Sequence, residues 1–304
     1  MTIIASMLHV VLALALSPLL IGVINRVKAK FAGRRGQPLL QPYYDLAKLL
    51  RKGAVYSRTT TWVFRAAPVW GLAGAVVAVA LVPLGALPAL AAFPGDLILL
   101  AYVLCTMRFM TVLAALDTGS AFEGMGASRE VQFSLLGEPV LLLSLAALAI
   151  CARSTGLSEI YATLFAGGAA RVTATVMMVA GALLLVLLAE NARIPVDDPN
   201  THLELTMIHE VMVLDHGGVD LAFIQYGAAL KLWVFSALLA GAAMPWRTGV
   251  AAADLVLGVG GVFAVAVVVG VAESTMARLR LVRVPQMLVV GGVLALAALL
   301  WALR

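Results

Sequence analysis

Long apolar runs decide what this chain can fold into. A run of about 20 apolar residues is long enough to cross the hydrocarbon core of a bilayer as an α-helix. We find such runs at about 3–24, 66–88, 95–116, 135–152, 172–190, 221–243, 251–273 and 285–303. The sequence therefore predicts an all-α, polytopic membrane protein with about eight transmembrane helices, in which residues 1–304 form a single membrane domain. The first run lacks a basic start and a clear cleavage pattern, so we expect a retained span, not a signal peptide.

The basic residues are distributed unevenly between the two sides of these spans. Ten of the 21 Lys and Arg residues lie between the first two runs, and the loops after spans three, five and seven bring that side to fifteen. The opposite loops and the C-terminus hold four. Cytoplasmic loops are enriched in Lys and Arg. We therefore expect a cytoplasmic (inner) membrane protein with both termini outside. The net charge of +5 is then no sign of nucleic-acid binding.

A short segment at 41–53 has the pattern of an amphipathic helix. Pro42 lies near its start and Gly53 near its end, and Tyr43, Leu46 and Leu49 fall on one side. Such a helix can lie in the headgroup plane on the cytoplasmic side. Simple anchoring by its basic residues is as good an interpretation as any specific role.

Isolated charges occur inside the apolar runs or at their ends. They are Arg108, Glu138, Glu190, Lys231 and Glu273. An unpaired charge at the centre of a transmembrane helix costs a few kcal/mol or more, so these groups must pair or face water. One interpretation is a set of packing pairs. The other is a hydrated polar axis, in which the acidic residues exchange protons and the basic residues adjust the pKa of those acids.

A dense polar stretch follows the fifth run and opens a predicted cytoplasmic loop at 191–220. Pro195 and Pro199 interrupt helical hydrogen bonding there. Its titratable residues are candidates for proton transfer, namely Asp197, His202, Glu204, His209 and Glu210. A metal site is disfavoured, because histidines seven positions apart on a helix lie about 10 Å apart along its axis.

The segment 117–130 is rich in glycine and acidic residues, and we expect a folded cytoplasmic loop that meets another subunit. It is neither a GxGxxG motif nor a P-loop, so nucleotide binding is not indicated. Arg129 and Glu130 could equally form a plain surface pair. The two cysteines, Cys105 and Cys151, lie in apolar runs without CxxC spacing, which is typical of inert buried thiols.

Several motifs together resemble a known family. They are residues 34–42, 45–50, 120–130, Glu138-Pro139, Glu190 with 193–195, Asp197, Pro199, Glu204-Leu205 and 273–280. They are similar to the membrane-anchor subunit of formate hydrogenlyase and related group 4 membrane-bound [NiFe]-hydrogenases. They also resemble the wider relative of that subunit, subunit 1 (the H-type subunit) of respiratory complex I. The resemblance covers nearly the whole chain.

The resemblance implies eight spans around a polar cavity and no cofactor or catalytic residue in this chain. Iron–sulfur clusters and a NiFe centre would belong to its partners: hydrogenase-like large and small subunits, a ferredoxin-like iron–sulfur subunit and antiporter-like membrane subunits. By this resemblance Glu138, Glu190, Asp197 and Glu204 would belong to an acidic route for protons. The candidates for docking the peripheral arm are Arg34, Arg35, Asp117, Glu123, Arg129, Glu130, Arg193, Asp198, Arg278 and Arg280.

The expected function is that of a membrane subunit that anchors a redox arm and couples it to proton or Na⁺ transfer. Departures from the complex I pattern occur at Val196, Asp198, His202 and 206–215, and they disfavour classical quinone binding. Three alternatives stay open: a quinone-binding subunit, a stand-alone ion or solute transporter, and a purely structural anchor. A stand-alone transporter is weakly disfavoured, because no inverted repeat is visible.

Overall fold

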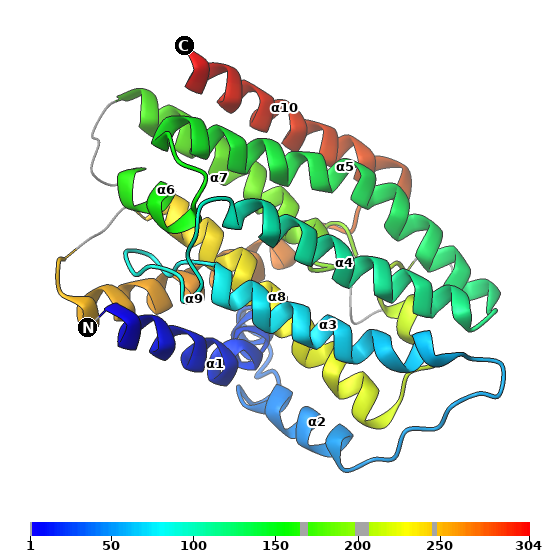
Figure 1. Cartoon of the computed structure of the whole chain (residues 1–304). Coiled ribbons are helices and arrows are strands. Elements are labelled where there is room, and N and C mark those ends of the chain that lie inside the picture. Colours follow the sequence, from blue (N-terminus) through cyan, green and yellow to red (C-terminus); the bar gives the residue numbers. More distant parts are fainter. Residues whose placement is uncertain (1, 165–169, 198–206, 245–247) are drawn as a thin grey trace.

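The fold is a bundle of long helices. The computed structural model describes residues 2–164, 170–197, 207–244 and 248–304. Within these ranges all regular structure is helical, and eight helices are long and apolar enough to cross a membrane, which confirms the predicted fold class (Figure 1). The long helices are α1 (Thr2–Phe31), α3 (Trp62–Leu81), α4 (Asp96–Asp117), α5 (Ala121–Ala152), α7 (Ala170–Glu190), α8 (Gly218–Ala243), α9 (Ala251–Thr275) and α10 (Val284–Leu303). The short elements are α2 (Gln41–Leu50), α6 (Leu157–Leu164), η1 (Glu210–Val213) and η2 (Leu281–Arg283).

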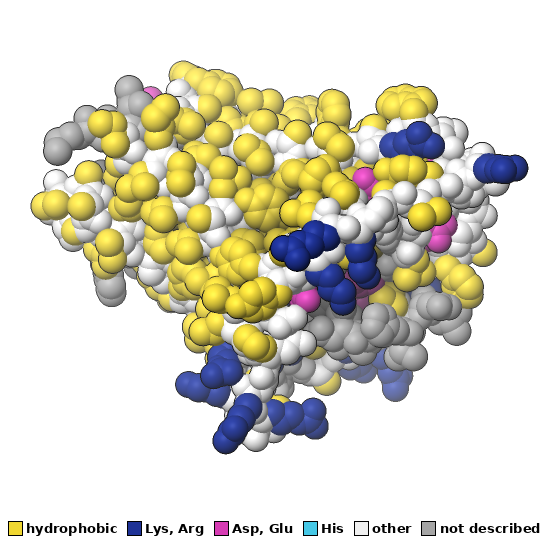
Figure 2. All heavy atoms as spheres, turned by 90° about the horizontal axis from the view of Figure 1, so that it is seen from below, with side chains coloured by type: hydrophobic (Ala, Val, Ile, Leu, Met, Phe, Trp, Pro, Cys, Tyr) yellow, Lys and Arg dark blue, Asp and Glu magenta, His cyan; other side chains and the backbone are white. Residues whose placement is uncertain are grey.

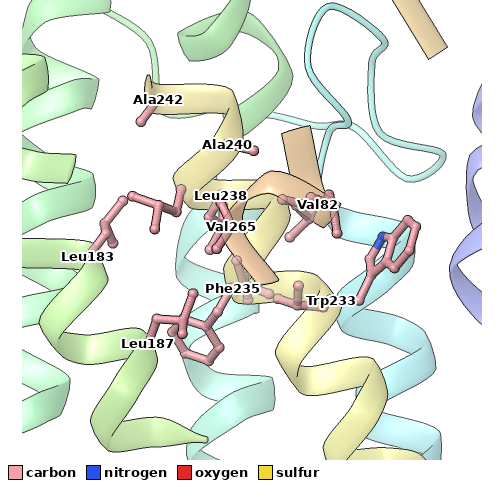
Figure 3. Packing of buried hydrophobic residues seen from close by; sticks show 14 of the residues in the cluster. Val82, Leu183, Leu187, Trp233, Phe235, Leu238, Ala240, Ala242 and Val265 are labelled. Atoms are coloured by element: carbon pink, nitrogen blue, oxygen red, sulfur yellow. The ribbon is translucent and has the colours of Figure 1, made fainter. Parts of the chain in front are cut away.

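Helix α8 lies at the centre of the bundle. It packs against α1, α3, α7 and α9, whereas α10 packs on α5 and α7 at the other side (Figure 1). Every residue from Leu232 to Ala242 is buried, and a helix that is apolar all round belongs inside a bundle. Figure 3 shows Leu183 and Leu187 of α7 directed at α8. On the other side of α8, the Trp233 indole donates to His9 Nε2 of α1 at 3.3 Å.

The charges divide the molecule into two ends. Figure 2 shows one part of the surface as mainly hydrophobic, while Lys and Arg side chains gather toward the other end. The even number of spans returns the chain to the end at which it started, so the N- and C-termini lie at the same end of the bundle (Figure 1).

Helix α2 begins at the depth of the middle of α1. The chain leaves α1 at Phe31 and runs back along that helix, so that a Cβ at Gly22 would collide with the carbonyl oxygen of Leu39. The Tyr43 hydroxyl then donates to the carbonyl oxygen of Ala15 at 2.5 Å. The amphipathic helix expected at 41–53 is therefore present at Gln41–Leu50, packed beside α1 and α8.

The expected start of the fourth span was wrong. The segment 117–130, expected to be a loop, is helical from Ala121, so α5 begins fourteen residues before the expected start at 135. Gly126 allows this stretch to pack closely against η1, since a Cβ there would lie 2.9 Å from Met212 Cγ and collide with Val211. Contacts with a segment far away in the sequence thus hold these first turns in a helix.

Candidate functional site

Arg108 is the centre of a buried group of ion pairs. It lies in α4 nine residues before Asp117, at a depth of roughly 13 Å from that end of the helix. Its Nε lies 3.0 Å from Glu130 Oε1, and its two terminal nitrogens contact Glu138 and Glu190. The guanidinium is a planar fork with five N–H donors, so one Arg side chain can serve three carboxylates. The side chain is only 9% exposed, which places this charge inside the protein.

Lys231 of α8 extends the group. Its Nζ lies 2.8 Å from Glu190 Oε2, so the carboxylate of Glu190 contacts Arg108 with one oxygen and Lys231 with the other. The Glu190 side chain is 6% exposed. Taking such a carboxylate out of water is costly unless it is paired and hydrogen-bonded. Two cations supply that pairing here.

His209 closes the group on the side of η1. Its Nε2 lies 3.3 Å from Glu130 Oε2. The backbone of this segment is held from three directions. Asp197 accepts from the amides of Ile208 and His209, at 3.0 and 3.2 Å. Arg129 donates to the carbonyl oxygen of Met207 at 2.8 Å, and Glu123 accepts from the amide of Asp215 at 3.1 Å. The imidazole is thereby positioned over Glu130.

The charges of this group do not balance with all acids ionised. Glu130, Glu138 and Glu190 provide three carboxylates, while Arg108 and Lys231 provide two permanent cations. The group becomes neutral when one further proton is bound, either on His209 or on a carboxyl group. The Glu138 side chain is 38% exposed and is the most open of the three acids.

A second set of ion pairs lies nearby on other helices. Glu273 of α9, with a fully buried side chain, contacts Lys28 of α1 at 2.8 Å and Arg193 at 3.5 Å. Arg278 contacts Asp197 at 2.8 Å. We expected Glu273 and Asp197 among the other proton-transfer candidates, and the structure gives them cations of their own.

A cavity of about 460 Å³ adjoins the Arg108 network. Arg108, Glu130, Glu190, Lys231 and Arg193 all line it. It continues between α1, α2, α3 and α8, where its lining is mostly apolar and includes Pro18, Ile21, Pro42, Leu46, Pro68 and Ala228. The polar residues Asn25, Gln37, Asp45 and Gln225 line it there as well. The cavity therefore has a charged end at the ion pairs and an apolar end beside the amphipathic helix.

His216 also lines this cavity, just before α8 begins. Its imidazole stacks on Phe64 of α3, with ring centroids 3.9 Å apart and planes 7° apart. Burial lowers the pKa of His216 below its usual value of 6.5, although Asp220 and Asp215 oppose that shift. The imidazole is accordingly neutral at neutral pH.

The structure brings together five of the ten proton-transfer candidates in one contact network: Arg108, Glu138, Glu190, His209 and Lys231. Glu210 lines the cavity that adjoins this network. Glu204 and His202, together with the docking candidate Asp198, lie outside the described residues.

Glu130 is the member of this network that sequence reasoning misplaced. We expected it at a docking surface, but it is 6% exposed and contacts both Arg108 and His209. A signal was present: Glu123, Glu130 and Glu138 are spaced seven and eight residues apart, which places them on one face if the segment is a helix.

The remaining docking candidates divide by exposure. Arg34, Arg35 and Arg280 are exposed, and Arg129 and Arg278 are partly exposed while contacting this chain's own residues. Asp117 accepts from the amide and hydroxyl of Thr61, at 2.6 and 3.0 Å. Glu123 and Arg193 are buried, so both make internal contacts in place of the expected surface ones.

Metal-ligand geometry is not found in the part of the chain that the structure describes: no three of its His, Cys, Asp or Glu side chains are grouped to hold an ion. Both cysteines are free and partly buried. The site holds carboxylates and an imidazole, which can bind and release protons, beside a guanidinium that stays charged and an ammonium.

The fold and the site define a class: a multi-pass helical membrane protein with a buried network of carboxylates and cations beside an internal cavity. Comparison with known families narrows this class, because the NADH dehydrogenase family matches residues 3–303. The chain belongs to that family.

Relatives place the chain in the branch that the sequence motifs indicate. It is 32% identical to hydrogenase-4 component C of Escherichia coli (strain K12), over 98% of this chain and 95% of that protein. It is 30% identical to formate hydrogenlyase subunit 4 of the same organism, over 92% of each. It is 26% identical to the H-type subunit of the NADH-quinone oxidoreductase of Anaplasma phagocytophilum (strain HZ), over 66% of this chain and 62% of that protein. The resemblance drawn from the motifs is thus confirmed.

A solved structure shares the fold. A chain of the membrane-bound sulfane sulfur reductase, described as an archaeal respiratory membrane complex, superposes with a TM-score of 0.84 at 21% identity, and the match covers 98% of each chain. At this identity the match shows a shared fold.

Proposed function

We propose that this chain anchors a hydrogenase-like peripheral arm, with iron–sulfur clusters and a NiFe centre in partner subunits, and passes protons through the Arg108 network. The observation that carries the proposal is the unbalanced charge of that network. Three carboxylates and two permanent cations surround one site, so the binding of one exchangeable proton would make the group neutral.

The route for this proton runs from His209 to Glu138. His209 contacts Glu130, Glu130 contacts Arg108, and Arg108 contacts Glu138. Arg108 remains charged and acts as a positioning residue, because a guanidinium does not release its proton in proteins. The proton is therefore carried by His209 and the carboxyl groups. His209, Glu130 and Glu190 line the adjoining cavity, whose water would carry the proton between them, whereas Glu138 meets the other acids at Arg108.

Redox chemistry in the peripheral arm drives proton uptake and release by the network. A change of charge near the cytoplasmic ends of α4 and α7 alters the electrostatic potential at Glu130 and His209, since interactions are weakly screened in the interior. The exposed Glu138 side chain is the point at which a proton leaves for a neighbouring antiporter-like subunit. We further propose the cytoplasmic membrane as its location, with both termini outside, because basic residues gather at the opposite end (Figure 2).

The proposal is tested on the intact complex. A tagged chain is purified from its host membrane in mild detergent, and partners are identified by mass spectrometry and metal analysis. We expect nickel, iron and a hydrogenase-like large subunit. Iron without nickel, together with a copurifying quinone, would contradict the hydrogenase assignment.

Proton transfer is tested in proteoliposomes that contain the same complex. We expect Glu190→Gln and Glu138→Gln to assemble, to retain hydrogenase turnover and to lose most of the accompanying proton movement. Glu159→Gln is the matched control, because Glu159 is an acid that contacts Ser154 at the opposite end of α5. Full proton movement in both network variants would disprove the route.

A second candidate, a quinone-binding subunit, is favoured by the apolar end of the cavity between α1, α2 and α3. It predicts quinone-dependent turnover that depends on cavity volume. Ala228→Phe would then block quinone reduction, whereas a proton-transfer subunit without quinone would keep its hydrogenase turnover.

A further inference from the structure

Four cations surround a small cavity where α1 ends. Arg26, Lys30, Arg34 and Arg35 line a space of about 430 Å³ together with Gly36 and Pro38. All four side chains belong to exposed residues. We call these residues the basic cradle. It is separate from the Arg108 network and its cavity, and the proposed function makes no use of it as a ligand site.

The backbone is folded so that the cradle is preformed. After Phe31 the chain reverses: the amide of Ala32 donates to the carbonyl oxygen of Lys28 at 3.0 Å, and that of Arg34 to Ala29 at 2.8 Å. Gly36 adopts φ of +67° and lies so close to Ala29 that a Cβ there would collide. The Arg26 guanidinium then donates to the carbonyl oxygen of Arg35 at 2.7 Å. This turn brings residues 34 and 35 back beside residues 26 and 30.

The positive charges of the cradle are not neutralised by the protein around them. Among the described residues, no carboxylate lies within 4.0 Å of any of the four cations. Like charges held together repel one another, and an anion relieves that repulsion. Arg in particular binds phosphate through paired N–H donors.

Exposed apolar side chains accompany the cradle. Phe31, Leu39 and Leu40 are 57%, 43% and 49% exposed. The segment that carries Leu39 and Leu40 runs back along α1 to the level of Gly22, so these side chains lie toward the membrane interior from the cations. A cationic site with apolar surface below it matches a ligand that has an anionic head and a hydrocarbon tail, and a soluble anion would gain nothing from the apolar part.

We propose that the basic cradle binds the headgroup of an anionic phospholipid, with its acyl chains along Leu39 and Leu40. Basic pockets at the cytoplasmic ends of transmembrane helices have the chemistry for such headgroups. The bound lipid would neutralise the cradle and hold the turn between α1 and α2 in place.

The test uses the intact complex in nanodiscs made from phosphatidylcholine with a minor fraction of phosphatidylglycerol. Lipid that stays with the complex after transfer to detergent is measured by mass spectrometry. The variant is Arg34→Gln with Arg35→Gln, and the matched control is Arg51→Gln with Lys52→Gln, which removes two exposed cations just after α2. We expect phosphatidylglycerol retention to fall roughly tenfold or more in the cradle variant alone.

Other outcomes would overturn the proposal. Equal loss in both double variants would show a general surface-charge effect. Unchanged lipid with loss of the peripheral arm would show that the cradle docks a protein. Full displacement of the lipid by inorganic phosphate would identify a phosphate site without a role for the tail. If the double variant fails to assemble, Arg34→Gln alone is compared with Arg51→Gln, with a smaller loss expected in the former.

Discussion

Arg108, in the middle of α4, forms an ion pair with Glu190, the last residue of α7, across 82 positions of sequence. Both side chains are at most 9% exposed. Each charge also has further partners, since Arg108 contacts Glu130 and Glu138 as well and Glu190 contacts Lys231. This pairing allows the charges to lie inside the bundle, where a lone charge costs several kcal/mol. The pair therefore links α4 to the end of α7 and forms the centre of the site.

Removing Arg108 should damage the whole network. Arg108→Met takes away the cation that Glu130 and Glu138 share, and breaking a buried pair in this way typically costs about 3–5 kcal/mol. We expect a large fall in the temperature of unfolding of the purified complex. For Arg108→Lys we expect a smaller fall in the temperature of unfolding, because lysine keeps the positive charge but lacks the planar guanidinium that contacts three carboxylates. Arg58→Met, at an exposed position of a loop, serves as the control. A loss no greater than that of the control would contradict the paired arrangement.

Glu130 and His209 should act as one unit. Their side chains lie 3.3 Å apart, and residues in contact give non-additive effects. We expect Glu130→Gln and His209→Gln each to slow proton movement, and the double variant to be no slower than Glu130→Gln alone. The measurement is the initial rate of proton movement in proteoliposomes at several pH values. Effects that simply add would show that the two residues serve different routes.

The packing of α5 on η1 can be tested with two neighbouring glycines. Gly126→Ala forces Val211 and Met212 away, and with them the segment that carries His209. A Cβ at Gly124 would meet nothing within 4 Å, so Gly124→Ala is the control on the same helix. We expect Gly126→Ala to lower thermal stability by about 1–3 kcal/mol and to reduce proton movement. Gly124→Ala should be neutral or slightly stabilising. Equal behaviour of the two variants would count against the close packing of η1 on this helix.

Because the pKa of His216 is lowered, we expect the stability of the folded protein to depend on pH. Burial lowers its pKa below the usual 6.5, whereas the unfolded chain keeps the usual value. Below about pH 6.5 the unfolded state therefore takes up a proton that the folded state resists, and stability falls with pH. At higher pH both states are neutral and that contribution is fully present. We expect the wild type to lose more thermal stability than His216→Asn between about pH 7.5 and 5.5. Parallel losses would show that His216 does not contribute.

Apolar length and charge at depth were enough to predict the class of fold and part of the site. Arg108, Glu138, Glu190 and Lys231 are conspicuous because charges in apolar runs must find partners. The sequence does not show which of these charged side chains form ion pairs with one another. The faces of helices that are apolar all round cannot be told apart by periodicity, so the contact of Glu190 with both cations depends on the packed bundle.

The error at 117–130 has a physical cause. The segment holds Gly119, Gly124 and Gly126 among polar residues, a composition that favours loops by local propensity. Its helical state depends on contacts with η1 and on the pairing of Glu130 with Arg108. Tertiary contacts of this kind override local preference. The depth at which α2 lies beside α1 could not be predicted from the sequence either. The amphipathic pattern predicts a helix, whereas its position depends on tertiary contacts such as that of Tyr43 with Ala15.

The central claim is that the Arg108 network holds an exchangeable proton, and infrared difference spectroscopy tests it most directly. The intact complex is cycled between its oxidised and reduced states, and the band of protonated carboxyl groups is followed. We predict a change in that band for the wild type, and its loss or shift in Glu138→Gln or Glu130→Gln but not in Glu159→Gln. A carboxyl band that is identical in the wild type and in both network variants would contradict the account.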